Sequence, residues 1–344
     1  MTSYSTLRTL PLASRLAAAK LPITMLVADE AHYIKNPDSL RTQAVRELAR
    51  ISTYATLMSG TPMENHPSEF LELLEAIRPG ERDTITKGIA DIGGAFCSPD
   101  KFQEAASLFY LRRNQNDVLA ELPELIEVEE WVDLTKSDLD AYRDAVFDRN
   151  FMGMRRAATI GSGAGRSAKL DCLDALLRDH RVSDRKVLIF SYFLDVLSEI
   201  ERRQSVCGTI SGKIQSVDRM RLVDEFQNRP GHAILLAQIE AGGQGLNVQA
   251  ASAVVIMEPQ FKPTTEAQAI ARAHRMGQTE SVLVHRLLAR GCVDEHLKRN
   301  LHMKQELFDA YARESLVKES SPRATSKQIE SKILRMEEER LRAA

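Results

Sequence analysis

Short continuous apolar runs alternate with amphipathic segments along this chain. Runs of four to eight residues with no polar face are typical of strands that are covered on both sides, whereas apolar positions three and four apart indicate helices. The predicted strands are 23–28, 53–58, 126–134, 186–190, 208–211, 233–237, 253–257 and 282–288. The predicted helices are 40–50, 68–77, 137–150, 196–204, 217–228, 265–276, 293–311 and 327–342. Regular strand–helix alternation in the second half predicts right-handed crossovers and a parallel α/β sheet.

The first apolar strand ends in two adjacent carboxylates, Asp29 and Glu30. In open α/β sheets, ligands bind at the carboxyl ends of the strands. A hard cation such as Mg²⁺ prefers one or two carboxylates together with phosphate oxygens and water, and a second carboxylate can orient a water for attack. These acids therefore suggest a metal site. The alternative is that they only cap the next helix.

The segment VADEAHYIKNPDS around these acids resembles the DEAH-type Walker B segment of helicase-superfamily-two ATPases, and more closely the Swi/Snf-type branch. Further motifs follow in that family's order, so the resemblance extends from about Thr2 to about Ala310. It implies two RecA-like (P-loop NTPase type) parallel-sheet lobes, the first N-terminally truncated and the second complete. It also implies an ATP-dependent double-stranded DNA translocase that uses ATP and Mg²⁺ between the lobes, with Asp29 on the metal, Glu30 positioning water and His32 coupling to the nucleotide.

The resemblance divides the chain into four parts. Residues 1–150 are expected to form a partial N-terminal ATP-binding lobe, and the Gly/Ser-rich residues 151–166 a linker. Residues 167–313 are expected to form the C-terminal helicase lobe, and 314–344 a charged helical tail that either braces the lobe or docks loosely. The opening segment Thr2–Arg8 resembles a family segment that faces DNA, although a frayed start is equally natural.

A second strand leads into Ser59-Gly60-Thr61-Pro62, which resembles the family's third motif. In the family these hydroxyls connect the Walker B carboxylates to the second lobe. The alternative is a strand-end turn in which Pro62 begins the next helix. Downstream, Arg112 and Arg113 resemble a Leu-Arg-Arg segment that contacts DNA or nucleotide, and a solvated charge pair is equally consistent with them.

Arg272 and Arg275 lie in a segment, Arg-Ala-His-Arg-Met-Gly-Gln, that is nearly diagnostic of the Swi/Snf-type branch. On the predicted helix, residues three apart share a face, and two guanidiniums on one face suit a phosphate chain. The resemblance implies that both act on the γ-phosphate, and that Gln278 lies at the nucleotide or at a lobe interface. The alternative is a basic solvent-exposed face.

The glycine-rich loop 241–247 resembles the family's fifth motif. The resemblance implies that Gly243 and Gly245 allow close backbone approach to a ligand or the other lobe, and that Asn247 contacts DNA. A simple tight turn is the alternative. The chain departs from the family at three places: the usual Ser/Thr-x-Lys is replaced by 237–240, the Trp-Trp-Asn by 260–262, and the aspartate before the first arginine by Ala271.

The phosphate-cradling motif G-x-x-x-x-G-K-[ST] does not occur in the sequence, and the nearest imitation, 161–167, reads as linker. We therefore expect these residues to be inactive alone. Either a complementary chain carries the Walker A half, or the chain is a non-catalytic DNA- or partner-binding remnant. The first sheet is also expected to have an unpaired edge.

Composition narrows the remaining possibilities. The 344 residues carry a formal net charge of −2, so DNA binding requires a local basic patch. The four cysteines are scattered, which predicts buried apolar residues rather than a zinc site or disulfides. Neither a signal peptide nor a membrane-spanning run is recognisable, so we expect a cytoplasmic protein, nucleoid-associated in a bacterium or nuclear in a eukaryote.

Overall fold

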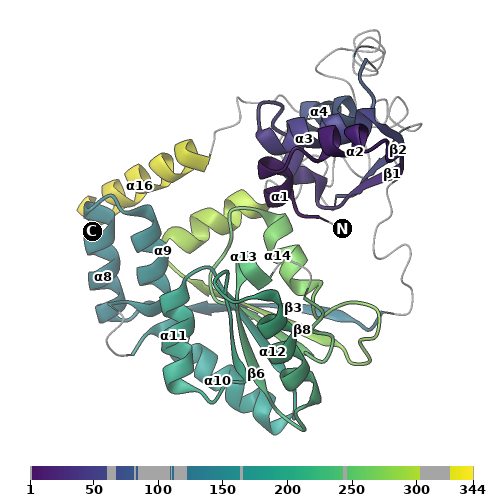
Figure 1. Ribbon diagram of the computed structural model, residues 1–344. Helices are drawn as coiled ribbons and strands as arrows, with labels where there is room; N and C mark the ends of the chain where they lie inside the picture. The colour runs from purple at the N-terminus through teal and green to yellow at the C-terminus, as the bar shows by residue number, and fades with distance from the viewer. Residues whose placement is uncertain are drawn as a thin grey trace. The chain divides into compact units, whose positions relative to one another are not determined.

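The computed structural model describes residues 2–59, 67–80, 83, 109, 111, 122–162, 166–242, 246–302 and 326–343 (Figure 1). The chain divides into two compact units. Unit 1 comprises Met1–Arg112 and Glu306–Arg323, and unit 2 comprises Arg113–Gln305 and Ala324–Ala344. Each unit is described separately below. No helix among the described residues is long and apolar enough to cross a membrane.

Unit 1 contains a parallel pair of strands, β1 (Ile23–Ala28) and β2 (Ser52–Leu57). Helices α1 (Tyr4–Thr9), α2 (Leu12–Ala18), α3 (Leu40–Arg50) and α4 (Pro67–Ile77), with the short helix η1 (Ala31–Ile34), surround an apolar core. Core residues Ala31, Ile34 and Val45 are fully buried. The Ser39 side chain caps α3 by accepting from Thr42 N.

Unit 2 is built on a six-stranded sheet with the order β3-β8-β7-β4-β6-β5, in which every neighbouring pair is parallel. The strands are β3 (Leu125–Val132), β4 (Val187–Ser191), β5 (Gly208–Ile210), β6 (Ile234–Gln238), β7 (Ala253–Ile256) and β8 (Val282–Ala289). The predicted parallel α/β fold of the second half is confirmed. The central strands β4 and β7 are buried along their whole length, which explains their continuous apolar sequences.

Alternate residues of the central strands enter two apolar cores, one on each face of the sheet. Leu188, Leu235 and Val254 pack with residues of α12 (Ser216–Asn228) and α14 (Pro263–Ile270). On the opposite face, Ile189, Leu236 and Val255 pack with α10 (Ala168–Val182) and α11 (Leu194–Arg203). This period of two is the physical basis of a doubly wound sheet, with helices on both faces (Figure 1).

A third core in unit 2 joins helices that are distant in sequence. Its members come from α8 (Lys136–Phe147), α9 (Phe151–Ile160), the helical residues 293–302 and α16 (Ser326–Ala343). Tyr142, Met154 and Val293 are fully buried within it. Cys292 is also buried there, as its apolar role predicts, and burial raises the pKa of its thiol. The tail helix α16 is therefore packed onto unit 2.

The structure contradicts the predicted boundary at residue 150. β3 pairs with β8 along all of its length, from Leu125 to Val132, and therefore belongs to the sheet of unit 2. Alternating apolar and acidic residues identified it as a strand, but that pattern carries no information about which sheet the strand joins. The contact is reinforced by Arg286, whose Nη1 donates to Glu127 at 2.8 Å.

The predicted linker 151–166 is also wrong, because most of it is α9. Asn150 caps this helix by accepting from Gly153 N at 2.8 Å, and Gly161, at φ 58°, ends it. Its glycines thus mark the ends of a helix rather than a flexible segment. The buried face consists of Phe151, Met154, Arg155, Ala157, Ala158, Thr159 and Ile160. Arg155 escapes sequence recognition as a core residue because of its charge.

Candidate functional site

The two acids follow β1 at a left-handed turn in unit 1. Glu30 has φ 51° and ψ 47°, a conformation that is uncommon for a residue with a side chain. Its own amide donates to Asp29 Oδ1 at 2.8 Å. Met58, which follows β2, donates its amide to Ala28 O and accepts from Ala31 N, both at 2.8 Å. The end of β2 therefore holds the turn from both sides.

Residues of the predicted third motif begin beside this turn. Ser59 follows Met58 directly and is half-buried. Gly60 and Thr61 lie outside the described residues, as do Pro62 and the rest of that loop. The register of β1 and β2, in which Ala28 is opposite Leu57, brings the two carboxyl strand ends level with each other. Residues 28 and 57 therefore end at the same edge of the sheet.

His32 lies against Glu30. Its Nδ1 is 3.1 Å from Glu30 Oε2, and its ring packs 4.3 Å from the Tyr33 ring. Arg41 Cζ lies 5.6 Å from the Tyr33 ring centre, which places a cation within cation–π range on the same aromatic side chain. The imidazole is thus in position to restrict the rotamer of the Glu30 carboxylate.

Tyr4 is a site residue that the sequence did not reveal. Its hydroxyl donates to the backbone oxygen of Asp29 at 2.7 Å, across 25 residues of sequence. Burial, and then the charges of Asp29 and Glu30, raise the pKa of Tyr4 to about 12, while Arg41 opposes this shift. Its position in a segment expected to face DNA gave no sign of this contact.

The chemistry of the donors at this turn fits Mg²⁺. Asp29 is exposed, and one of its carboxylate oxygens accepts a backbone amide, while Glu30 is half-buried beside it. Among the described residues, no group of three or more histidines, cysteines and acids could hold a metal ion by itself. Two hard oxygen ligands with exposed space suit an ion that completes its shell with water and phosphate.

In unit 2 the two arginines lie beyond the helix that was predicted to carry them. α14 ends at Ile270, and residues 271–277 form successive turns, so the predicted helix 265–276 is too long. At this point the backbone hydrogen bonds join residues three apart instead of four: Arg272 N donates to Ala269 O, and Ala273 N donates to Ile270 O. Arg272 O accepts from Val248 N at 3.1 Å, which ties the turn to the segment after the glycine loop.

Arg272 and Arg275 are both half-buried, whereas their neighbours Ala273 and His274 are buried. His274 Nε2 lies 2.8 Å from the backbone oxygen of Pro123, which identifies it as a packing residue. The structure therefore places the two arginines on one tightly anchored turn. Their predicted action on the γ-phosphate stays a prediction.

Gln278 makes its contacts inside unit 2. Its Nε2 donates to the backbone oxygens of Gln249 at 2.9 Å and Ala251 at 2.8 Å, and its Oε1 accepts from the amides of Thr279 and Glu280. The side chain is 9% exposed. Gln278 thus fixes the turn that follows the arginines, because both ends of its amide are occupied.

The remaining predicted residues are divided between described and undescribed parts. Gly243, Gly245, Arg112 and Arg113 lie outside the described residues. Asn247 is exposed, with its Nδ2 3.4 Å from Gln249 Oε1. Its predicted DNA contact stays a prediction.

A buried polar cluster lies at the carboxyl ends of β4 and β7. The Glu258 carboxylate accepts from Ser191 Oγ at 3.0 Å and from the Tyr192 amide. Burial raises the pKa of Glu258, opposed chiefly by the charge of Arg155. The Arg155 guanidinium is enclosed by the rings of Tyr192, Phe193 and Phe261, with its carbon 5.2–5.5 Å from their centres.

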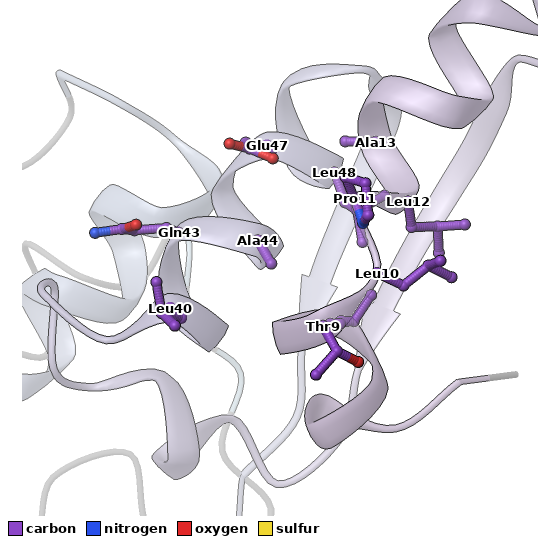
Figure 2. A pocket seen from close by; sticks show the side chains of 11 residues that line it. Thr9, Leu10, Pro11, Leu12, Ala13, Leu40, Gln43, Ala44, Glu47 and Leu48 are labelled. Atoms are coloured by element: carbon purple, nitrogen blue, oxygen red, sulfur yellow. The ribbon is translucent and has the colours of Figure 1, made fainter.

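A cavity of about 260 Å³ lies between α1, α2 and α3 in unit 1 (Figure 2). Leucine and alanine side chains line most of it, and Gln43 and Glu47 supply polar groups (Figure 2). None of the predicted catalytic, metal-binding or nucleotide-binding residues is among the residues that line this cavity, although Leu7 of the segment Thr2–Arg8 is.

Comparison with known proteins gives the class of this chain. A model of the SNF2-related domain matches residues 1–187, and a model of the helicase conserved C-terminal domain matches residues 168–277. The first match alone covers more than half of the chain. The chain therefore belongs to the SNF2-related family of Swi/Snf-type, helicase-like proteins of superfamily two.

Individual relatives support this assignment. The chain is 29% identical to the Danio rerio chromodomain-helicase-DNA-binding protein 1-like, over 90% of the chain and 34% of that protein. It is 26% identical to the Oryza sativa DNA excision repair protein CSB, over 78% of the chain and 27% of the relative. It is 25% identical to the Schizosaccharomyces pombe ATP-dependent helicase fft1, over 84% of the chain and 40% of that protein. The chain thus spans roughly a third of the length of these relatives.

A solved structure confirms the fold. The crystal structure of the C-terminal part of the Fun30 ATPase domain aligns with a TM-score of 0.52 at 19% identity, covering 64% of this chain and all of that one. The Sulfolobus solfataricus SWI2/SNF2 ATPase core in complex with dsDNA covers 90% of this chain at 23% identity, with a TM-score of 0.46. The match to the Fun30 structure, together with the parallel sheet of unit 2, confirms the predicted RecA-like α/β architecture.

Proposed function

We propose that this chain forms part of an ATP-dependent double-stranded DNA translocase of the Swi/Snf type. The observation that carries the proposal is the carboxylate turn of unit 1, where Glu30 is held in a left-handed conformation directly after β1. Uncommon backbone conformations persist where the surrounding structure enforces them, and they concentrate at functional sites. Relatives named as a helicase, a DNA-binding protein and a DNA repair protein support ATP and DNA as ligands.

In this proposal Asp29 binds Mg²⁺, which neutralises charge on the transferred phosphoryl group when it is bound. Glu30 orients the attacking water and accepts its proton on a carboxylate oxygen. His32, 3.1 Å from that carboxylate, keeps Glu30 in place. Arg272 and Arg275 stabilise the negative charge of the γ-phosphate, as paired guanidiniums are suited to do.

We further propose that these 344 residues do not hydrolyse ATP by themselves. The sequence contains no run of the form G-x-x-x-x-G-K-[ST], the loop whose backbone amides and lysine grip the phosphates. A phosphate loop from outside these residues, in the same polypeptide or in a complementary chain, would complete the site. DNA-stimulated opening and closing of the assembled ATPase would then step along the duplex.

The test compares ATP turnover by the chain alone with turnover when a loop-bearing segment is supplied, each with and without double-stranded DNA. The chain alone is expected to show no turnover, in wild type and in Glu30→Gln alike. With the loop supplied, DNA-stimulated turnover is expected, and Glu30→Gln should reduce it by roughly 10²–10⁴-fold. Glu47→Gln, which alters an exposed acid of α3, is the matched control.

The opposite outcomes are equally specific. Turnover by the chain alone would refute the need for an outside loop. DNA binding without any turnover, even when the loop is supplied, would identify the chain as a non-catalytic DNA-binding remnant.

A further inference from the structure

The Tyr4 side chain connects the first helix of the chain to the carboxylate turn. Tyr4 is the first residue of α1, is half-buried, and its ring centre lies 6.0 Å from that of Tyr33. Its hydroxyl donates to Asp29 O at 2.7 Å. The phenol therefore contacts the backbone of a proposed metal ligand rather than its carboxylate.

This hydrogen bond acts on one particular peptide. The Asp29 carbonyl and the Glu30 amide belong to the same peptide plane. Tyr4 holds the carbonyl, and Asp29 Oδ1 accepts from the amide at 2.8 Å. The plane is thus fixed at both ends, once by a distant helix and once by its own side chain.

The conformation of Glu30 shows what this restraint prevents. Rotating the Asp29–Glu30 peptide by about half a turn changes the φ of Glu30 by a similar angle, which would carry it from 51° to a negative value, the sign that residues with a side chain prefer. That rotation would relieve a left-handed conformation, release Asp29 Oδ1 from the Glu30 amide and redirect both carboxylates. The following peptide is held independently, because Ala31 N donates to Met58 O.

We propose that Tyr4 is a positioning residue for the carboxylate pair: its hydroxyl locks the Asp29–Glu30 peptide against rotation and so presents the Asp29 carboxylate to a divalent cation with the Glu30 carboxylate beside it. This inference rests on the proposed function, since it assigns the residue that prepares the metal site. The phenol is protonated at physiological pH, and burial and the two carboxylates raise the pKa of Tyr4 further, to about 12.

Tyr4→Phe tests the proposal by removing one oxygen and keeping the ring. Tyr54→Phe is the matched control, since Tyr54 lies on β2 in the same unit with its side chain 65% exposed. The first measurement is amide hydrogen exchange. In Tyr4→Phe the Glu30 amide should exchange about tenfold faster, the size expected for one lost hydrogen bond, while the amides of Leu26 and Leu57 should not change.

The second measurement is the affinity of the full chain for Mn²⁺ alone, followed by the paramagnetic broadening it causes. Tyr4→Phe should weaken the affinity by roughly three- to tenfold, and Tyr54→Phe should leave it unchanged. Asp29→Asn, which removes a proposed ligand, should nearly abolish binding. A residue with only a structural role would change the exchange of Leu26 and Leu57 as well as that of Glu30.

The outcomes separate the two proposals. If Asp29→Asn weakens Mn²⁺ binding and Tyr4→Phe does not, the role of Tyr4 is refuted while the metal site stands. If Asp29→Asn leaves binding unchanged, the metal site fails and this inference fails with it. Equal acceleration of exchange at Glu30, Leu26 and Leu57 in Tyr4→Phe would show that Tyr4 supports the fold in general, which also refutes the proposal.

Discussion

Lys169 and Asp294 form an ion pair that is completely removed from solvent. Their side chains are 0% exposed and their charged atoms lie 2.6 Å apart. Lys169 Nζ also donates to Met257 O at 3.0 Å, and Asp294 Oδ2 accepts from Ala289 N at 3.0 Å. The pair links α10 to the helical residues 293–302. A buried charge of this kind is tolerated only while its partner is present.

Asp294→Ala is therefore expected to lower the free energy of unfolding by about 3–5 kcal/mol, because it leaves the Lys169 ammonium buried without a counter-charge. Urea unfolding of the full chain measures this. Asp133→Ala, which breaks the exposed contact with Arg290, should change the same quantity by less than about 1 kcal/mol. Equal effects of the two substitutions would contradict the assignment.

Two buried histidines make the stability of unit 2 depend on pH. His180 Nε2 and His285 Nε2 are 3.2 Å apart, and His285 Nδ1 is 2.9 Å from Glu130 Oε1. Burial, then His285, then Arg185 and His232, lower the pKa of His180 to about 4 from 6.5, while Asp179 opposes the shift. Between about pH 4 and 6.5, His180 is therefore protonated in the unfolded chain but neutral in the folded protein.

The stability associated with His180 is fully present above about pH 6.5 and is lost as the pH falls toward 4, by a total on the order of 3 kcal/mol. Urea midpoints between pH 7.5 and 4 measure this change. His180→Gln should flatten the dependence, and His302→Gln, at an exposed position, should preserve it. An unchanged slope in His180→Gln would disprove the assignment.

At the scale of elements, α16 is anchored by one buried acid. Glu337 Oε2 accepts from Tyr142 Oη at 2.9 Å, and His296 Nε2 is 2.9 Å from Oε1. Burial by itself would raise the pKa of Glu337, but the hydrogen bonds from His296, Arg340 and Tyr142 lower it below its ordinary value. The carboxylate stays charged because its partners compensate for burial.

Glu337→Ala is expected to loosen α16 by roughly 2–4 kcal/mol, since it leaves the buried hydroxyl of Tyr142 and the imidazole of His296 without their acceptor. Faster proteolysis within 326–343 is the measurable result. Glu339→Ala, at an exposed position of the same helix, serves as the comparison. Similar cleavage rates for the two variants would mean that apolar packing alone holds α16.

Much of the fold was predictable because local patterns determine it. The strand 23–28 and the helix 40–50 agree with the structure at both ends, since a continuous apolar run and a Ser39 cap define them. α9 was missed because Arg155 and two glycines hide its buried face. The pairing of β3 with β8 was missed because register depends on contacts between residues more than 150 positions apart.

The candidate site shows the same division. Asp29 and Glu30 are adjacent in sequence and follow a recognisable strand, so the sequence revealed them. Tyr4 was missed as a site residue because its contact crosses 25 residues and leaves no periodic pattern. The turn that carries Arg272 and Arg275 was predicted as helix because the local sequence does not indicate the hydrogen bond between Val248 N and Arg272 O.

At the scale of the whole molecule, the two units differ in how well their sheets are supported. The described part of unit 1 contains a sheet of two strands, on which Met25, Val27 and Tyr54 are half or more exposed. Unit 2 contains six strands with cores on both faces. Two-stranded sheets are marginal without further packing.

We therefore expect backbone amides of β1 and β2 to exchange faster than those of β4, β6 and β7, by a difference in opening free energy of a few kcal/mol. Hydrogen exchange followed by mass spectrometry measures this on the intact chain. Residues 1–80 as protected as residues 185–290 would contradict the expectation.

The left-handed backbone at Glu30 has an unusual implication for protein engineering. Glycine adopts that geometry without penalty, so Glu30→Gly would relax the chain while deleting the proposed proton acceptor. The substitution would then raise thermal stability and abolish the proposed catalytic activity at the same time. A library of variants selected only for thermal stability would therefore enrich variants that are more stable but catalytically inactive.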